Sequence, residues 1–99
     1  MNKLFVIYTT SQFECPWCIR AKELLRIYGF DFYEKDIHTD PKWKKEFLER
    51  GFKKIPQVYF EDTLIGGYNN TKDWVRNKFF ENYSPEKKQK IIQELEDIS

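Results

Sequence analysis

The chain has few of the residues that would build a metal centre or a cross-linked scaffold. Its 99 residues include two cysteines, one histidine, four glycines and four prolines. A disulfide-rich mini-protein needs more cysteines than this, and a tetrahedral zinc site needs four ligands. Disorder is not expected either, because 40% of the residues are hydrophobic and 18% are aromatic.

A surplus of charge of one sign is also lacking, since 17 Lys and Arg face 16 Asp and Glu. This balance gives no reason to expect nucleic acid or a membrane surface as a partner. No apolar run approaches the roughly 20 residues of a membrane-spanning helix. The N-terminus, Met1-Asn2-Lys3, leads into the first predicted strand without a signal-peptide hydrophobic segment. We therefore expect a cytoplasmic monomer with a single domain over residues 1–99.

The two cysteines stand two residues apart, in Cys15-Pro16-Trp17-Cys18, after an apolar run and before a helical pattern. Unpaired N–H groups and the positive end of the dipole stabilise a thiolate at a helix N-terminus. We expect an exposed Cys15 as the nucleophile and a less exposed Cys18, one turn further in, as the resolving thiol. The alternatives are a pair of inert buried thiols and half of a zinc site.

Periodicity and turn residues predict the element order β-α-β-α-β-β-α-α. The first two strands are expected to be parallel through a right-handed crossover, with a later antiparallel hairpin at the edge. Asn69 or Asn70 is expected to cap the third helix. Predicted strands cover residues 4–8, 31–37, 57–60 and 63–65, and predicted helices begin near residues 16, 41, 69 and 85. Residues expected to face inward are Ala21, Leu24, Leu25 and Tyr28, then Trp43, Phe47 and Leu48, and finally Ile91, Ile92, Leu95 and Ile98.

Ile55-Pro56 precedes the third predicted strand. A proline there is explained by a turn or by the start of an edge strand. Alternatively, a cis bond would turn the backbone N–H and C=O of Ile55 outward beside the dithiol, where an extended peptide could pair with them.

Gly66-Gly67-Tyr68-Asn69-Asn70 connects the last strand to the third helix. Glycine and asparagine suit a plain strand-to-helix turn. The same residues also fit an anion site made by backbone N–H groups at the helix start, suited to a carboxylate. Trp17, between the cysteines, has two readings as well. It either borders the site and contacts substrate, or is an exposed aromatic with partial packing.

Three pieces of sequence, in this order and spacing, resemble the dithiol glutaredoxins of the thioredoxin superfamily. They are Cys15-Pro16-Trp17-Cys18, Ile55-Pro56-Gln57-Val58-Tyr59-Phe60 and Ile65-Gly66-Gly67-Tyr68-Asn69. The resemblance covers about residues 3 to 80, and the long stretch from Tyr8 to Cys15 resembles that of bacteriophage members. It implies an α/β, thioredoxin-like fold with a four-stranded mixed sheet flanked by helices. An extra C-terminal helix, about residues 84–98, would cover the core without a chemical role.

The resemblance also implies glutathione as co-substrate and no permanently bound cofactor or metal. By analogy, Cys15 would form the mixed disulfide with glutathione. Ile55, before a cis Pro56, would pair with the cysteinyl backbone of glutathione. Lys54, where the family usually has Thr, would meet its glycyl carboxylate.

In the same way, the N–H groups of Tyr68 and Asn69, behind Gly67, would hold the γ-glutamyl carboxylate. The chain departs from the family pattern at Asn69, where an Asp is frequent, and at Trp17, where Tyr or Phe is usual. Glu14 stands next to Cys15, where a basic residue is often close by, and its charge should oppose thiolate formation.

The function implied is a glutathione-dependent thiol–disulfide oxidoreductase that reduces protein disulfides or glutathionylated proteins, with ribonucleotide reductase among the substrates. One alternative is a thioredoxin-like electron carrier reduced by a flavoprotein reductase. Another is a non-catalytic module that binds glutathione or shares an iron–sulfur cluster, ligated by Cys15 and glutathione, between two subunits.

Overall fold

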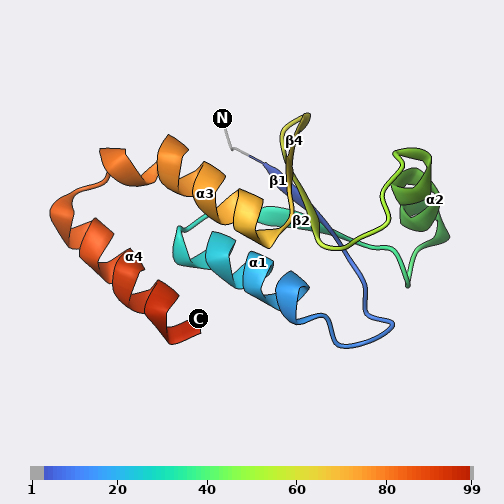
Figure 1. The fold of residues 1–99 in the computed structure, drawn as a ribbon, viewed down its shortest axis with the longest axis horizontal. Coiled ribbons are helices and arrows are strands. Elements are labelled where there is room, and N and C mark those ends of the chain that lie inside the picture. Colours follow the sequence, from blue (N-terminus) through green and yellow to red (C-terminus); the bar gives the residue numbers. More distant parts are fainter. Residues whose placement is uncertain (1–3, 99) are drawn as a thin grey trace.

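The computed structural model describes residues 4–98 and shows a four-stranded sheet flanked by helices (Figure 1). The predicted order of strands and helices is confirmed, with one short 3-10 helix (η1) that was not predicted. Residues 1–3, including the start of the predicted core at residue 3, lie outside the described residues. The elements are β1 (Phe5–Thr9), α1 (Pro16–Ile27), β2 (Phe32–Asp36), α2 (Pro41–Glu49), β3 (Gln57–Phe60), β4 (Thr63–Gly66), α3 (Tyr68–Lys78), η1 (Phe80–Asn82) and α4 (Pro85–Ile98).

The sheet has the strand order β2-β1-β3-β4. β1 is parallel to β2 and antiparallel to β3, and β4 adds an antiparallel edge next to β3. This is the mixed topology that the sequence predicts. The continuous apolar sequence of β1 follows from its central place, because Phe5, Ile7 and Tyr8 are all fully buried.

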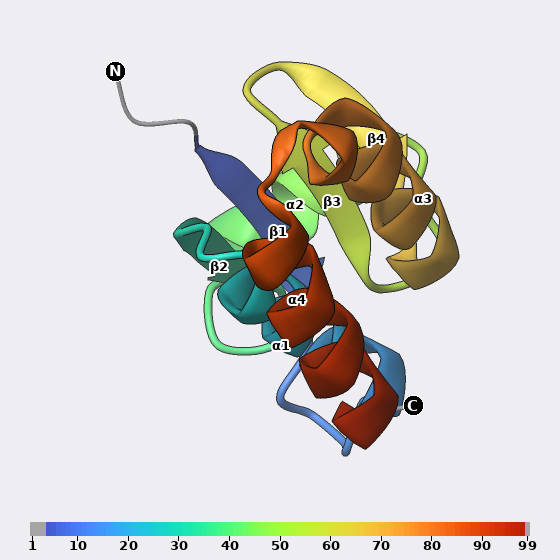
Figure 2. The same cartoon turned by 90° about the vertical axis from the view of Figure 1, so that its left-hand side faces the viewer.

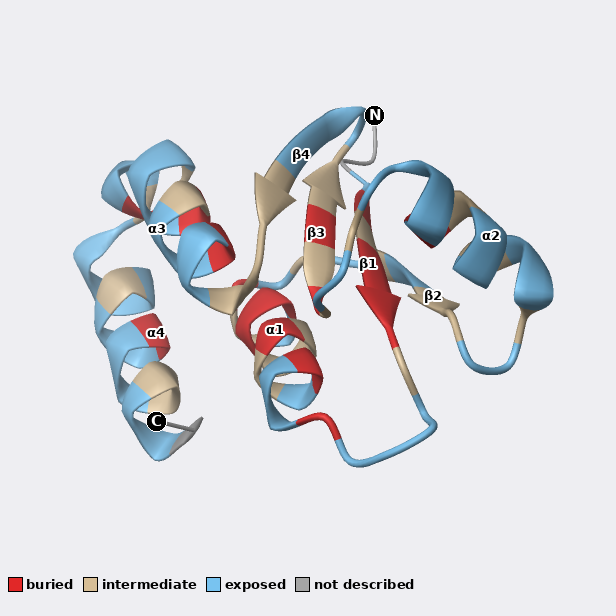
Figure 3. Ribbon diagram, turned by 45° about the vertical axis from the view of Figure 1, so that its right-hand side comes forward, coloured by how far each residue is buried: buried red, intermediate tan, exposed pale blue. Residues whose placement is uncertain are grey.

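Alternate residues of β1 face opposite layers of the molecule. Phe5 and Ile7 belong to one core cluster together with Leu24 of α1 and Val75 of α3, so these two helices cover one face. Tyr8 faces the other side, where its ring centroid lies 5.7 Å from that of Phe47 in α2. Figure 3 shows the buried positions concentrated on β1, β3 and α1, the middle of these layers.

A polar cluster attaches α2 to the sheet. The Glu46 carboxylate accepts a hydrogen bond from the Tyr8 hydroxyl and pairs with Lys35 at 2.7 Å and Arg50 at 3.4 Å. Burial, followed by the hydrogen bond to Glu46, raises the pKa of Tyr8. Partial burial by itself would raise the pKa of Glu46, but the hydrogen bonds from Lys35 and Tyr8 outweigh it and lower that pKa. Tyr8 therefore stays protonated and Glu46 charged at neutral pH.

The prediction that Leu48 faces inward is wrong, since this side chain is 59% exposed. α2 has nine residues and covers the sheet with one face, which Phe47 occupies at 4% exposure. The next position along a helix is rotated by about 100°, which turns Leu48 away from the sheet.

The C-terminal helix α4 packs against α1, as the sequence predicts for an added helix that covers the core (Figure 2). Ile91 is 2% exposed and Leu95 packs against the same core cluster. The prediction for Ile92 is wrong, because it is 40% exposed and lines a groove between α3 and α4. The side chain of Ile98 lies outside the described residues. Among residues 4–98, no helix is both long and apolar enough to pass through a bilayer.

Candidate dithiol active site

Cys15 caps the N-terminus of α1. Its backbone is extended (φ −116°, ψ 92°), and its Sγ accepts a hydrogen bond from the N–H of Cys18 at 3.2 Å. Pro16 occupies the first turn, where its missing N–H leaves no hydrogen bond unmade. This geometry places Cys15 Sγ at the positive end of the helix, where a thiolate is stabilised.

Cys15 and Cys18 form a disulfide in the structure, with their Cα atoms 5.2 Å apart. The predicted proximity of the two sulfurs is therefore confirmed, and the structure represents the oxidised form of the dithiol. The predicted order of exposure also holds, at 7% for Cys15 and 2% for Cys18. The expectation that Cys15 would be openly exposed is wrong for this oxidised form, because each sulfur of a disulfide covers part of the other.

The loop before Cys15 is held by Asp36, at the end of β2. The Asp36 Oδ1 accepts hydrogen bonds from the backbone N–H of Ser11 at 3.1 Å and of His38 at 2.9 Å. Partial burial alone would raise the pKa of Asp36, but the hydrogen bonds from Ser11 and His38 outweigh it and lower the pKa. The sequence analysis did not single out Asp36. Its side chain accepts a hydrogen bond from the backbone N–H two residues later, at His38, which is a common way for Asp to form a turn.

Folding lowers the pKa of Asp36. Its carboxylate therefore stabilises the fold at pH values above its pKa in the unfolded chain, about 3.9, and this stabilisation is lost as the pH falls through its lower pKa in the folded protein. Asp36→Ala should lower the free energy of unfolding by about 1–2 kcal/mol at pH 7, since two hydrogen bonds to a carboxylate are lost. Asp36→Asn, which keeps an acceptor oxygen without the charge, should lose less. Urea unfolding at several pH values from 7 to 2.5 measures the free energy of unfolding of each protein. If the difference between the wild type and Asp36→Ala did not become smaller below about pH 4, the stabilising role assigned to the Asp36 carboxylate would be contradicted.

A second network ties α1 to the end of β1 and the middle of β2. Thr9 is 1% exposed and donates its hydroxyl to Glu34 Oε2 at 2.6 Å. Lys22, one turn after Cys18 in α1, pairs with the same oxygen at 3.0 Å. These contacts fix the dithiol helix relative to the sheet, and no sequence motif indicated them.

The structure brings Trp17 against the start of α3. The Trp17 ring centroid lies 5.6 Å from that of Tyr68, and the Arg20 guanidinium lies 4.7 Å from the Trp17 ring. Trp17 nevertheless remains 48% exposed beside the disulfide. Arg20, three residues after Trp17, was missed, although this spacing places two helical side chains next to each other.

The Ile55-Pro56 peptide bond is cis, the alternative that the sequence left open. Pro56 is buried, and its carbonyl oxygen lies 3.7 Å from where a Cβ on Gly67 would stand. The segment around Pro56 therefore adjoins the start of α3, where Trp17 contacts Tyr68. The three motifs of the sequence thus meet at one end of the sheet.

The N-cap residue of α3 is Gly67 and not Asn69 or Asn70, although the Asn70 side chain takes part in the cap. Asn70, at the third helical position, accepts a hydrogen bond from the Gly67 N–H at 3.2 Å. Thr71, fully buried, donates its hydroxyl to the Gly67 carbonyl at 2.8 Å. Asn69 is exposed in the first turn, and Lys54 is exposed on the loop before Pro56. Within residues 4–98, no group of three or more His, Cys, Asp or Glu side chains is arranged to hold a metal ion.

Comparison with known proteins shows which family the chain resembles. The glutaredoxin family model matches residues 5–65. The chain is 41% identical over 63 residues to a glutaredoxin of Pseudomonas aeruginosa, covering 63% of this chain and 73% of that one. Among solved structures, Glutaredoxin 1 from Francisella tularensis, complexed with cacodylate, aligns with a TM-score of 0.62 and 26% identity over 78% of this chain and 100% of that one. NrdH-redoxin from Escherichia coli, a glutaredoxin-like protein, shares the fold with a TM-score of 0.64, 23% identity and coverage of 83% and 99%.

A thioredoxin-like fold with a Cys-X-X-Cys disulfide at the start of its first helix defines a thiol–disulfide oxidoreductase. The family model and the bacterial relatives narrow this class further. The chain belongs to the glutaredoxin family.

Proposed function

We propose that the protein is a glutathione-dependent oxidoreductase that reduces protein disulfides or glutathionylated cysteines through Cys15 and Cys18. The observation that carries the proposal is the Cys15–Cys18 disulfide at the tip of α1 in a chain of the glutaredoxin family. Family membership supports glutathione as the reductant, and no cofactor need be bound permanently.

The reaction begins when the Cys15 thiolate attacks one sulfur of a substrate disulfide. A Cys15–substrate disulfide forms, and the other substrate sulfur leaves as a thiolate, which takes a proton from solvent. The Cys18 thiolate then attacks Cys15 Sγ, which releases the second substrate thiol and leaves the Cys15–Cys18 disulfide.

Two glutathione molecules restore the dithiol. The first attacks Cys15 Sγ, forms a mixed disulfide with it and frees Cys18. The second attacks the glutathione sulfur of that mixed disulfide, releases Cys15 and leaves as oxidised glutathione. Two electrons pass from two glutathione thiols to one substrate disulfide, so the cycle balances.

For glutathione binding, we assign the backbone of Ile55, before Pro56, to the cysteinyl backbone of glutathione. The N–H groups of Tyr68 and Asn69, behind Gly67, would hold the γ-glutamyl carboxylate. First-turn N–H groups of a helix have no acceptor within the helix, which suits them to an anion. The proximity of Pro56 to Gly67 supports one continuous site.

Two exposed side chains complete the proposed site. Trp17, 48% exposed beside the disulfide, would border the bound glutathione. Lys54, exposed on the loop before Pro56, would pair with the glycyl carboxylate. The resemblance to glutaredoxins further supports a cytoplasmic monomer, with one domain over residues 1–99, that acts on disulfide-bearing proteins such as ribonucleotide reductase.

The fold is shared with NrdH-redoxin, a protein described as having a thioredoxin-like activity profile. The competing function is therefore a carrier reduced by a flavoprotein reductase. Reduction of a protein disulfide should proceed with NADPH, glutathione and glutathione reductase, and should be slow with NADPH and thioredoxin reductase. The reverse preference would reject glutathione dependence. A coloured protein after anaerobic purification would instead favour the cluster-binding alternative.

Mass spectrometry gives the most direct test of the proposal. The Cys18→Ser variant, mixed with oxidised glutathione, should gain one glutathione adduct, located at Cys15 by peptide mapping. Cys15→Ser should gain little adduct at Cys18, which is 2% exposed. Equal labelling of both variants would reject the assignment of Cys15 as the attacking residue.

A further inference from the structure

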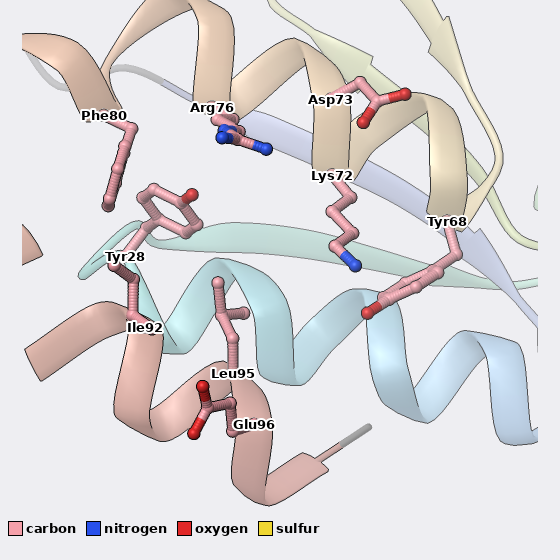
Figure 4. Close-up of a pocket in the computed structure, with 9 residues that line it drawn as sticks. All are labelled: Tyr28, Tyr68, Lys72, Asp73, Arg76, Phe80, Ile92, Leu95 and Glu96. Atoms are coloured by element: carbon pink, nitrogen blue, oxygen red, sulfur yellow. The ribbon is translucent and has the colours of Figure 1, made fainter. Parts of the chain in front are cut away.

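A groove lies between α3 and α4, beside the proposed glutathione site (Figure 4). Its cavity has a volume of about 280 Å³. Apart from Tyr28, its lining residues lie between Tyr68 and Glu96, C-terminal to the segment that the glutaredoxin family model matches. The groove therefore exists because α4 has been added beside α3.

The α3 wall of the groove carries two cationic side chains, Lys72 and Arg76, and one carboxylate, Asp73. Tyr68, Lys72 and Arg76 recur every four residues and so share one face of α3. Figure 4 shows Lys72 extending from α3 toward α4, and Arg76 and Asp73 of the same helix also line the groove. Among residues 4–98, the ion pairs formed do not involve Lys72 or Arg76. Two cationic groups are thus available to a ligand on this wall.

The α4 wall offers apolar surface. Ile92 is 40% exposed and Leu95 is partly exposed, and both line the groove, with Phe80 at its end. Glu96 adds a carboxylate to this same wall. An occupant would therefore place an apolar group against Ile92 and Leu95 of α4 and an acidic group against Lys72 and Arg76 of α3.

The groove is continuous with the dithiol site through one ring contact. Tyr68 lies 5.6 Å from Trp17 and also lines the groove. Lys72 follows one helical turn later, about 5.4 Å further along α3. Trp17 and Lys72 are therefore both neighbours of Tyr68, so a short extended segment of a substrate could reach from the dithiol into the groove.

We propose that this groove binds a segment of the substrate protein that carries a hydrophobic residue next to an acidic one, a few positions from the reacting cysteine. The proposal rests on the proposed function, because it supplies the substrate specificity of the same dithiol. A peptide segment is favoured as the occupant because the groove adjoins the dithiol site through Tyr68, where a substrate protein must bind. Lys72 and Arg76 pair with the acidic side chain, and Ile92 and Leu95 contact the hydrophobic one.

The test uses two synthetic peptides, each with one cysteine joined to glutathione in a mixed disulfide. In both peptides the cysteine is central and has a spacer of three Gly or Ser residues on each side. Beyond each spacer stands the dipeptide Leu-Glu in one peptide and Leu-Lys in the other. The wild-type protein should turn over the Leu-Glu peptide with a KM about fivefold lower, as expected for two partly exposed ion pairs. Lys72→Glu/Arg76→Glu should reverse this preference.

The matched control is Lys44→Glu/Lys45→Glu, which makes the same change in net charge on exposed positions of α2, at the far side of the molecule from α3 and α4 (Figure 1). It should keep the wild-type preference for the Leu-Glu peptide. All variants should turn over the small mixed disulfide of glutathione and mercaptoethanol at the wild-type rate, because that substrate does not reach the groove. If the Glu double variant is unstable, Lys72→Gln/Arg76→Gln should abolish the preference instead.

Equal KM values for the two peptides in the wild type, or a preference that survives in the Lys72 and Arg76 variants, would overturn the proposal. Failure of the proposed function is recognised separately, as absence of glutathione-driven turnover of the small disulfide. In that case, fluorescence anisotropy with Cys→Ser versions of the two labelled peptides still decides the groove. The same roughly fivefold difference in Kd, reversed by the charge change, is expected there.

Discussion

Cys15→Ser should reduce turnover of a glutathionylated protein by roughly a thousandfold or more, whereas Cys18→Ser should retain most of it. The expectation follows from the helix-tip position of Cys15 and from the chemistry, because a glutathionylated substrate needs one protein thiol and glutathione resolves the intermediate. On a protein with an internal disulfide, both variants should be slow, since Cys18 must then release the product. An NADPH-coupled assay with glutathione and glutathione reductase measures both activities.

The two variants form a matched pair. Each one removes the Cys15–Cys18 disulfide, so a loss of stability from that bond is common to both. Ser at position 15 can still accept the hydrogen bond from the Cys18 N–H, since Ser is a favourable N-cap residue. A difference in turnover therefore reports the chemistry of Cys15, and an equal loss on the glutathionylated substrate would contradict the roles assigned to the two thiols.

Gly66→Ala should lower the free energy of unfolding by about 2–4 kcal/mol. Gly66 has φ +124°, a conformation that side-chain-bearing residues rarely adopt, and an added Cβ would lie 2.8 Å from Asn70 Oδ1. That oxygen accepts the hydrogen bond from the Gly67 N–H at the start of α3, so moving it away also costs the cap. For a domain of this size the melting temperature should fall by roughly 10–25 °C.

Gly67→Ala is the control for this prediction. Gly67 has φ −82°, and a Cβ there would meet its nearest neighbour, the Pro56 carbonyl oxygen, at an ordinary 3.7 Å. The expected loss is within about 1 kcal/mol, the usual cost of a less favourable N-cap residue. Thermal unfolding followed by circular dichroism compares the two variants, and similar melting temperatures for both would show that the conformation of Gly66 is not required.

Local sequence signals predicted most of the fold because each element carries its own start, stop and periodicity. Asp40 before Pro41 begins α2, Gly29 follows the end of α1 with φ +82°, and the turn at Glu61-Asp62 separates the two strands of the hairpin. The wrong predictions concern residues whose surroundings come from elsewhere in the chain. Leu48 and Ile92 have the same hydropathy as their buried neighbours, and only the packing of α2 and α4 decides which of them is covered.

The candidate site divides in the same way. Cys15, Trp17 and Cys18 were apparent from four consecutive residues, and Gly67 and Tyr68 from a short turn motif. Asp36 and the Thr9–Glu34–Lys22 network were missed, because their partners come from separate segments that meet only in the folded sheet.

By itself, the sequence determined the dithiol, the order of the helices and strands and the family, because these depend on residue types at short spacing. The tertiary structure alone decided that Trp17 meets Tyr68, that Pro56 adjoins Gly67, and that α4 forms a groove with Lys72 and Arg76. The physical reason is that contacts between distant segments depend on how the helices pack on the sheet, which no local pattern of residues records.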